Sequence, residues 1–134
     1  METQIEQDSG RSRTDMGLQI LIVDDNQSIT ALLEDIIDLE DHTATVVHNG
    51  NDAKTALSGN SFDMAFCDLT LPDISGWEVV EYIKENSPGV EIAVISGLGD
   101  NIPQDKLSEH NIDLVVKKPF QITEIQSLLQ GIAH

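Results

Sequence analysis

The sequence predicts an α/β fold in which a doubly wound sheet of five parallel strands carries helices on both faces. Two observations support this fold. Short apolar runs alternate with segments whose apolar residues recur every three or four positions, and the alternation repeats five times. The connections are short, and strands separated by helices pair in parallel through right-handed crossovers. A chain of 134 residues is long enough for a single core of this kind.

Five segments have the composition of strands. The first is the continuous apolar run "ILIV", which is typical of a strand buried on both faces of a sheet. The others are short and rich in Val, Ile and Ala. In chain order the expected strands are residues 20–23, 43–47, 62–68, 90–96 and 112–118.

Three helices are expected before the fourth strand. The second of them, over residues 52–57, is short, and the third is capped by Ser75 and stops before Pro88. The first follows Asn26 and has the apolar stripe of an amphipathic helix, with spacing i, i+3, i+4, i+7 and i+8. This stripe consists of Ile29, Leu32, Leu33, Ile36 and Ile37.

Two further helices complete the alternation, and with them the expected single domain over residues 18–134. The helix at residues 103–110 is polar and has little beyond Leu107 to bury. Residues 1–17 are polar and rich in small residues, so we expect a flexible lead-in there. No second apolar-periodic unit follows, so no output domain is expected within the chain. The closing helix has a clear apolar stripe of Ile122, Ile125, Leu128, Leu129 and Ile132.

The charge of the chain argues against several partners. It has 24 acidic and 7 basic residues, and its formal net charge is −17. Nucleic-acid binding needs clustered Lys and Arg, and anionic lipid repels an acidic surface, so we expect neither nucleic acid nor a membrane as a direct partner. No apolar run approaches the roughly 20 residues of a membrane-spanning helix. An acidic surface is compatible with cation binding and with a basic partner.

The chain has one cysteine, Cys67, which lies inside an apolar run. A disulfide framework within the chain is therefore excluded, and a reducing compartment, the cytoplasm, is expected. No second cysteine or activating cation adjoins Cys67, so we expect it to be a small buried core residue.

Polar residues gather where the expected strands end. In an open parallel sheet, ligands bind at the carboxyl ends of the strands, near the point where the strand order reverses. The amino ends carry nothing comparable. The residues at the carboxyl ends are Asp24 and Asp25 after the first strand, Asp68 in the third, Ser96 in the fourth and Lys118 in the fifth.

These residue types indicate a cation and phosphoryl chemistry. Hard oxygen ligands select Mg²⁺, Mn²⁺ or Ca²⁺ over zinc, and an open site suits Mg²⁺ with a phosphate-bearing substrate. A carboxylate beside Mg²⁺ can attack phosphorus, while Lys118 and Ser96 can donate to the phosphoryl oxygens. Taken alone, Asp25 could instead cap the next helix, and Lys118 could be a structural counter-ion of Asp68. The histidines show no metal-ligand spacing and are expected at the surface: His42, His48, His110 and His134.

The same residues lie in motifs that resemble the receiver domain of two-component response regulators, over residues 18–132. "ILIVDDN" resembles the first-strand motif of that family, and "DLTLPDISGWE" resembles its phosphoacceptor segment. "VISG" and "KKPF" resemble the ends of its fourth and fifth strands. The four motifs occur in order, each at its own strand end, which makes the resemblance specific.

The resemblance implies a flavodoxin-like fold with strand order 2-1-3-4-5 and a signalling switch rather than an enzyme. Asp68 would accept a phosphoryl group from a histidine kinase or a histidine phosphotransfer protein, in the presence of Mg²⁺. The only catalysis would be the chain's own phosphoryl transfer and dephosphorylation. The implied Mg²⁺ ligands are Asp25 and Asp68 directly, Asp24 through water, and the backbone carbonyl of Thr70.

The resemblance also implies how the switch works. Ser96 and Lys118 would contact the phosphoryl oxygens, and the Lys118-Pro119 peptide would be cis. Ser96 would move on activation and repack the face of the fourth helix, fifth strand and fifth helix. A homodimer would form through the same face. Val115 stands where the family usually carries Tyr or Phe, so the aromatic half of the family's switch is missing.

Two alternatives of other kinds remain open. A degenerate receiver would bind its partner without phosphorylation; the intact acids and Lys118 argue against it, although Val115 leaves room for it. A Mg²⁺-dependent aspartyl phosphohydrolase generally has an acid two residues after its nucleophile, where this chain has Thr70. A nucleotide-binding role is poorly supported because no Gly-rich loop follows the first strand. The sequence indicates neither the cognate kinase nor the downstream partner.

Overall fold

The computed structural model of the chain describes residues 17–97 and 102–133. The expected flexible lead-in lies outside the described residues, apart from Gly17. Among the described residues, no helix is long and apolar enough to cross a membrane.

The described strands form one five-stranded parallel sheet in the order β2-β1-β3-β4-β5. This order confirms the predicted doubly wound, flavodoxin-like fold. The chain passes from β1 outward to β2, returns to the other side of β1 for β3, and continues to β5, so the order reverses between β1 and β3. The strands are β1 (Gln19–Val23), β2 (Thr43–Val47), β3 (Met64–Asp68), β4 (Glu91–Ser96) and β5 (Leu114–Lys117).

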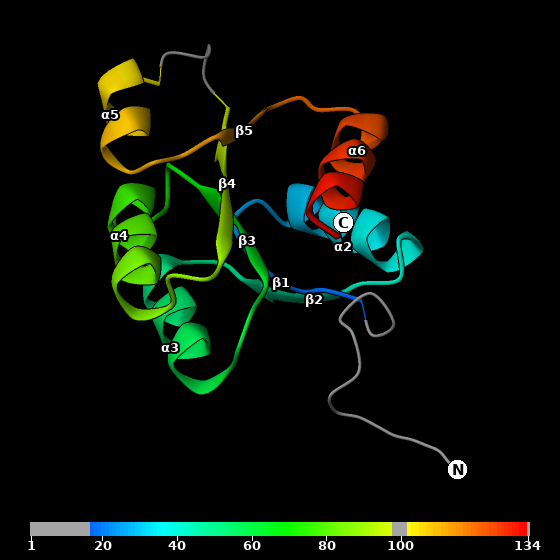
Figure 1. The fold of residues 1–134 in the computed structure, drawn as a ribbon, viewed down its shortest axis with the longest axis horizontal. Helices are drawn as coiled ribbons and strands as arrows, with labels where there is room; N and C mark the ends of the chain where they lie inside the picture. The colour runs from blue at the N-terminus through cyan, green and yellow to red at the C-terminus, as the bar shows by residue number, and fades with distance from the viewer. Residues whose placement is uncertain (1–16, 98–101, 134) are drawn as a thin grey trace.

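The helices form one layer on each side of the sheet (Figure 1). Helices α2 and α6 cover one face, and α3, α4 and α5 cover the other. The side chains of Asn26 and Ser75 accept hydrogen bonds from backbone N–H groups of the first turns of α2 and α4. The bounds are α2 (Gln27–Leu39), α3 (Gly50–Gly59), α4 (Gly76–Asn86), α5 (Gln104–Glu109) and α6 (Ile122–Ala133).

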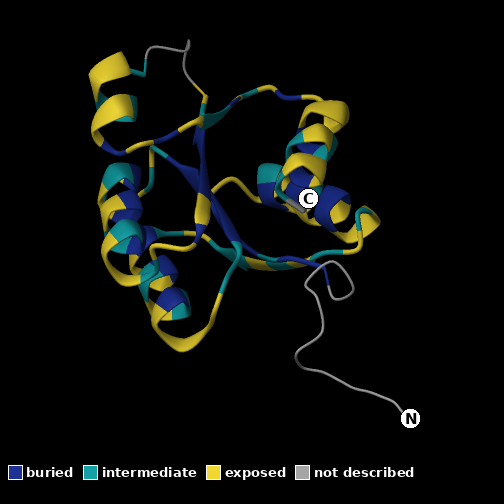
Figure 2. Ribbon diagram, in the orientation of Figure 1, coloured by how far each residue is buried: buried dark blue, intermediate teal, exposed yellow. Residues whose placement is uncertain are grey.

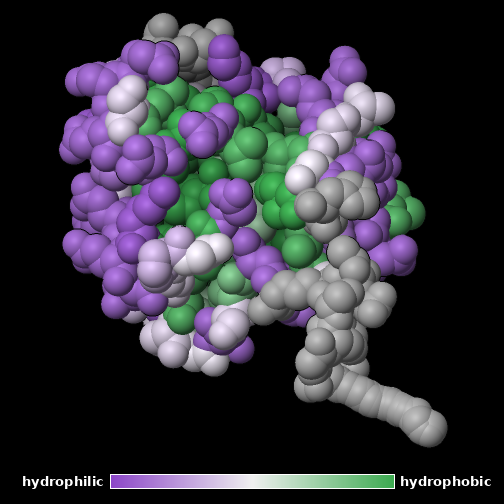
Figure 3. All heavy atoms as spheres, in the orientation of Figure 1, coloured by the Kyte–Doolittle hydropathy of each residue, from purple (hydrophilic) through white to green (hydrophobic). Residues whose placement is uncertain are grey.

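The core consists of two apolar clusters, one on each face of the sheet. Along β1 the side chains alternate between them: Ile20 and Ile22 pack under α2 and α6, while Leu21 and Val23 pack on the other face. This explains why the first strand has an unbroken apolar sequence. Burial is concentrated in the central strands and on the inner sides of the helices (Figure 2). In the same view, hydrophilic side chains cover both helical layers and apolar ones show between them, around β4 and β5 (Figure 3).

Two strands are shorter than the sequence predicts by two or more residues. Strand β3 begins at Met64 because Asp63 forms two hydrogen bonds with the backbone of Gln19. Its N–H donates to the Gln19 carbonyl (2.7 Å), and its carboxylate accepts the Gln19 N–H (2.8 Å). Strand β5 begins at Leu114 because the N–H of Ile112 donates to the Leu107 carbonyl (2.9 Å), in the turn that ends α5.

The surface position expected for His110 is wrong. This residue is 7% exposed, and its ring stacks on Trp77 with centroids 4.8 Å apart. Its Nε2 lies 3.1 Å from a carboxylate oxygen of Glu81, and its Nδ1 lies 3.0 Å from the Lys106 carbonyl. No residue of α5 itself is buried, so His110 is a main attachment of this helix to α4. Of the other histidines, His48 is exposed, His42 is half-buried and His134 lies outside the described residues.

We therefore expect His110→Ala to lower the free energy of unfolding by about 1–2 kcal/mol, because it removes a buried ring stack and two polar contacts. Urea denaturation followed by circular dichroism measures this change. Glu109→Ala, an exposed neighbour in the same turn, is the matched control and should change stability by less than about 0.5 kcal/mol. Equal effects of the two substitutions would show that the His110 contacts do not hold α5.

Candidate functional site

The predicted site residues meet at the carboxyl edge of the sheet. Asp24 follows β1, Asp68 ends β3, Ser96 ends β4 and Lys118 follows β5. Strands β1 and β3 are neighbours, with Val23 in register with Cys67, so the acids that follow these two residues lie side by side.

The centre of the site is the ammonium group of Lys118. Its Nζ lies 3.0 Å from Oδ2 of Asp24 and 3.0 Å from Oδ2 of Asp68. Asp24 is fully buried, Asp68 is 5% exposed, and the Lys118 side chain is 18% exposed. One partly buried cation therefore bridges two buried carboxylates.

Burial and hydrogen bonding act in opposite directions on the pKa of Asp24, which is raised overall. Desolvation raises the pKa of its carboxyl group, although the Asn26 N–H, which donates to Oδ1 at 2.9 Å, and Lys118 act in the opposite direction. Its Oδ2 has Lys118 Nζ nearby but no well-aligned hydrogen bond among the described residues. Burial lowers the pKa of Lys118, but Asp68 and Asp24 outweigh this effect and raise it overall. Lys118 is therefore a cation at neutral pH.

The donor atoms suit a divalent cation. One carboxylate oxygen from each of Asp24, Asp25 and Asp68 can be chosen so that all lie within 4.8 Å of one another. Lys118 offsets one of these three charges, and Asp24 retains an oxygen without a hydrogen bond. Hard carboxylate oxygens in an open site fit Mg²⁺. The cavity beside them measures about 240 Å³ and is lined by Asp25, Asn26, Asp68, Thr70, Gly97 and Lys118.

The segment after Asp68 is packed directly against it. The N–H of Thr70 donates to Oδ1 of Asp68 at 2.9 Å, and Thr70 forms an isolated bridge to Ser75. Gly76 approaches so closely that a Cβ there would lie 2.1 Å from the carbonyl oxygen of Asp68. Any larger residue at position 76 would push the start of α4 away from the site.

Two residues of the expected switch, Ser96 and Val115, do not line the cavity. The Ser96 carbonyl accepts the Lys118 N–H at 2.8 Å, which fixes the end of β5 to the end of β4, but the Ser96 side chain does not line the cavity. Val115 is half-buried in the cluster beneath α3, α4 and α5. The Lys118-Pro119 peptide is cis.

In the capping alternative Asp25 would have shared the cap of α2 with Asn26 or Ser28, and the structure assigns the cap to Asn26. The side-chain oxygen of Asn26 accepts the N–H groups of Ser28 (2.9 Å) and Ile29 (3.1 Å) and is the cap of α2. Asp25 is exposed beside the cavity, where its carboxylate faces the other acids.

The contact of His48 with the site was not found by sequence reasoning. His48, just after β2, donates from Nδ1 to the Asp24 carbonyl at 3.1 Å. It fixes the backbone that carries Asp24 and Asp25. No local pattern signals this contact, because its partner is a backbone atom 24 residues away.

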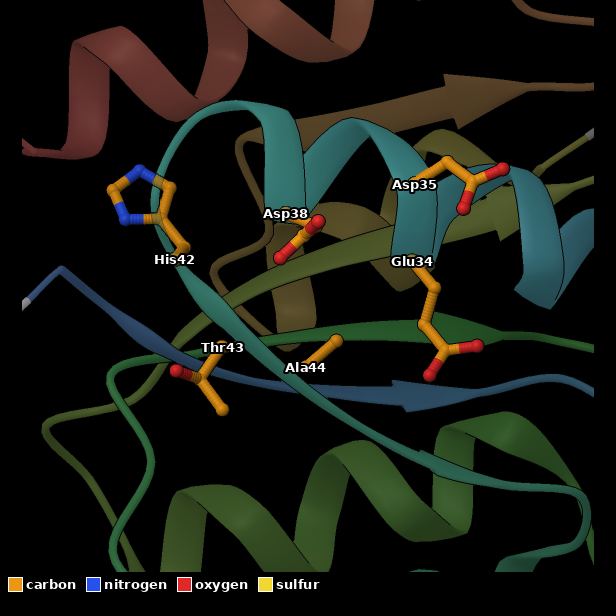
Figure 4. Close-up of a pocket in the computed structure, with 6 residues that line it drawn as sticks. All are labelled: Glu34, Asp35, Asp38, His42, Thr43 and Ala44. Atoms are coloured by element: carbon orange, nitrogen blue, oxygen red, sulfur yellow. The ribbon is translucent and has the colours of Figure 1, made fainter.

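A larger hollow of about 400 Å³ lies elsewhere, between α2 and β2 (Figure 4). Its three acids are Glu34, Asp35 and Asp38, and their carboxylates point in different directions. His42 is already engaged, since its Nδ1 accepts the Leu18 N–H at 2.9 Å. Among the described residues, these side chains form no cluster of ligand atoms like that of the sheet edge.

Comparison with known proteins gives the family of this fold and site. The response regulator receiver domain family matches residues 20–130. The chain belongs to this family. Receiver domains are signalling domains rather than enzymes in the usual sense, they are phosphorylated by histidine kinases, and they generally bind Mg²⁺ at an acidic cluster. In this receiver domain three aspartates are grouped at the carboxyl edge of the sheet.

Individual relatives agree with this assignment. The receiver domain is 27% identical to the transcriptional regulatory protein TcrA of Mycobacterium tuberculosis, with 88% of this chain and 47% of TcrA covered. It is 30% identical to the transcriptional regulatory protein YkoG of Bacillus subtilis, with 84% of this chain and 49% of YkoG covered. The chain thus spans about half the length of these curated relatives.

Solved structures show the same fold. A receiver domain from Methylobacillus flagellatus is 28% identical and superposes with a TM-score of 0.77, covering 87% of this chain and 98% of that one. A CheY-like receiver domain protein from Methanospirillum hungatei, 20% identical, has a TM-score of 0.81 and covers 87% and 94% of the two chains.

We expect Asp24→Asn to stabilise the Mg²⁺-free receiver domain at pH 7. Since the folded-state pKa of Asp24 is raised, its ionised form destabilises the fold at neutral pH. This penalty disappears as the pH falls through that pKa toward the unfolded value of 3.8, so the gain should shrink on acidification.

Urea denaturation in EDTA at several pH values measures this effect. Asp35→Asn, at an exposed site in α2, removes the same charge without burial and is the matched control. A loss of stability in Asp24→Asn at pH 7 would mean that attraction to Lys118 outweighs the cost of burying the charge.

Proposed function

We propose that this receiver domain is a phosphoacceptor switch in which Asp68 takes a phosphoryl group from a phosphohistidine donor in the presence of Mg²⁺. The donor would be a histidine kinase or a histidine phosphotransfer protein. The observation that carries the proposal is the Lys118 ammonium, 3.0 Å from both Asp24 and Asp68, in a site that retains excess negative charge. Such a site is arranged for a cation and for an anionic group.

The cation would be held by the acids of the sheet edge. We assign Asp25 and Asp68 as direct ligands, Asp24 as a ligand through water, and the Thr70 backbone carbonyl as a further ligand. Bound Mg²⁺ would neutralise charge that develops on the phosphoryl oxygens. The nearness of the three carboxylates supports this assignment, and so does the oxygen of Asp24 that has no hydrogen bond.

The chain's own groups would then carry the transfer. A carboxylate oxygen of Asp68 attacks phosphorus, a P–O bond forms, and the P–N bond to the donor imidazole breaks, which gives an acyl phosphate. In the resting site the Lys118 ammonium donates a hydrogen bond to Asp68. After the transfer it would donate to a phosphoryl oxygen instead. Ser96, at the end of β4, would donate a hydrogen bond from its hydroxyl to a phosphoryl oxygen. This needs a local movement, because its side chain does not line the cavity at rest.

The consequence would be a shift between two conformations rather than turnover of a substrate. A phosphoryl group adds negative charge at a site built around one ammonium group, and this favours the conformation that stabilises it. We propose the face of α5, β5 and α6 as the surface that responds and as the face of a homodimer. The apolar side chains around β5 support this choice (Figure 3). The single buried cysteine is compatible with action in the cytoplasm.

The two alternative functions fit the site less well. A degenerate receiver would have no need for a buried acid pair held by one lysine. An aspartyl phosphohydrolase would generally have an acid two residues after its nucleophile, and this chain has Thr70 at that position. Self-catalysed dephosphorylation remains part of the proposal, since the cavity of about 240 Å³ is open enough to admit water.

Intact-mass measurement after treatment with acetyl phosphate tests the proposed function. We expect one phosphoryl group to be added in Mg²⁺ and none in EDTA, because three carboxylates repel the donor unless a cation offsets them. Asp68→Asn should abolish the addition. Asp38→Asn, at an exposed acid of α2, should label like the unmodified chain.

Equal labelling of Asp68→Asn would refute the assignment of the acceptor. An unlabelled chain at saturating Mg²⁺ would favour the degenerate receiver. Sustained release of p-nitrophenol from p-nitrophenyl phosphate would favour the phosphohydrolase.

A further inference from the structure

We propose that Asp73 is a positioning residue of this site, which ties the segment after Asp68 to the first turn of α3 and so fixes the Thr70 carbonyl. This inference rests on the proposed function, because it concerns a group that would hold the cation. It assigns a role to a residue that is exposed and that does not line the cavity.

The carboxylate of Asp73 makes an unusually complete set of backbone contacts for an exposed side chain. Its Oδ1 accepts the N–H of Gly50 at 2.8 Å, and its Oδ2 accepts the N–H of Asn51 at 2.9 Å. Oδ1 also accepts the N–H of Ile74 at 2.8 Å, which fixes the rotamer. Gly50 and Asn51 begin α3, where free N–H groups favour an anionic partner. These bonds lower the pKa of Asp73, so it is ionised at neutral pH.

A second contact holds the same two segments together. A Cβ on Gly50 would lie 2.2 Å from Cγ1 of Ile74, so glycine at position 50 lets Ile74 lie against the start of α3. Ile74 is half-buried and packs on the cluster beneath α3, α4 and α5. The tip of the segment is thus attached to α3 by a polar and an apolar contact.

The other end of the segment is attached to the phosphoacceptor itself. Thr70 donates its N–H to Asp68, and the bridge between Thr70 and Ser75 closes residues 70–75 into a tight loop. Thr70 therefore lies in a loop held at its base by Asp68 and at its tip by Asp73. Loss of the tip contact would loosen the loop that carries the Thr70 carbonyl. Asp24 would keep its contacts with Asn26 and Lys118, and Asp68 would keep its bond from Lys118.

This placement separates a positioning role from a merely structural one. If Asp73 orients a ligand carbonyl, its loss weakens cation binding and leaves the reacting groups intact. If Asp73 only stabilises the fold, its loss lowers the melting temperature and leaves the affinity of the folded protein for Mg²⁺ unchanged.

The primary test is the Mg²⁺ affinity of the chain, measured by isothermal titration calorimetry with MgCl₂. The second test is the Mg²⁺ dependence of acetyl phosphate labelling. We expect Asp73→Ala to weaken Mg²⁺ binding about tenfold, the lower end of the effect of removing a group that orients a ligand. The labelling rate at saturating Mg²⁺ should stay within about twofold of the unmodified chain, since Asp68 and Lys118 are untouched. Asp73→Asn keeps one acceptor oxygen and should give an intermediate affinity.

The matched control is Asp52→Ala. Asp52 is an exposed acid in the same first turn of α3, and its carboxylate bonds the Asn49 side chain rather than the loop. This substitution removes the same charge from the same helix end and should leave Mg²⁺ affinity unchanged. Equal weakening in Asp52→Ala would show that the effect comes from charge and would overturn the proposal.

Three further outcomes also test the role of Asp73 or the proposed function. Unchanged Mg²⁺ affinity in Asp73→Ala overturns the positioning role, even if phosphorylation of the unmodified chain succeeds. If Asp73→Ala does not fold, unchanged affinity in Asp73→Asn overturns it equally. If the unmodified chain binds Mg²⁺ but is never labelled, the proposed function fails, and the titrations still decide the role of Asp73.

Discussion

The site depends on the ammonium group of Lys118, which lies between two carboxylates buried at the ends of β1 and β3. Two adjacent buried anions would otherwise repel each other in a region with little water to screen them. One cation does not balance Asp24, Asp25 and Asp68, so the site is held together and still lacks positive charge. That imbalance makes the same few atoms suited to a divalent ion and an incoming phosphoryl group.

The topology of the sheet explains how these groups come together. Strands β1 and β3 are neighbours, which brings their terminal acids side by side, but β5 is separated from β3 by β4. Only a long side chain can cross the end of β4, and Lys118 does so over Gly97, where a Cβ would lie 3.5 Å from Cδ of Lys118. The bond from the Lys118 N–H to the Ser96 carbonyl fixes its starting point. The site is thus a consequence of strand order and of one side-chain length.

Much of this arrangement could be predicted from the sequence, because parallel strands bring their carboxyl ends to one edge. The positions of Asp24, Asp68 and Lys118 follow from that rule alone. What could not be predicted depends on contacts with no local pattern. His110 is buried through Trp77 and Glu81, on a helix 29 or more residues earlier, and Asp73 is held by backbone groups 22 and 23 residues away. Strand β3 begins late because Asp63 bonds the backbone of Gln19 rather than extending the strand.

The most direct test of the phosphoacceptor assignment is to locate the phosphoryl group. After acetyl phosphate treatment in Mg²⁺, borohydride reduces an aspartyl phosphate to homoserine, and peptide mass spectrometry then finds the altered residue. We predict homoserine at position 68 and at no other aspartate, with no conversion in EDTA. Conversion at Asp24 or Asp25, or an unchanged residue 68 in a chain that has gained a phosphoryl group, would contradict the assignment of Asp68 as the acceptor.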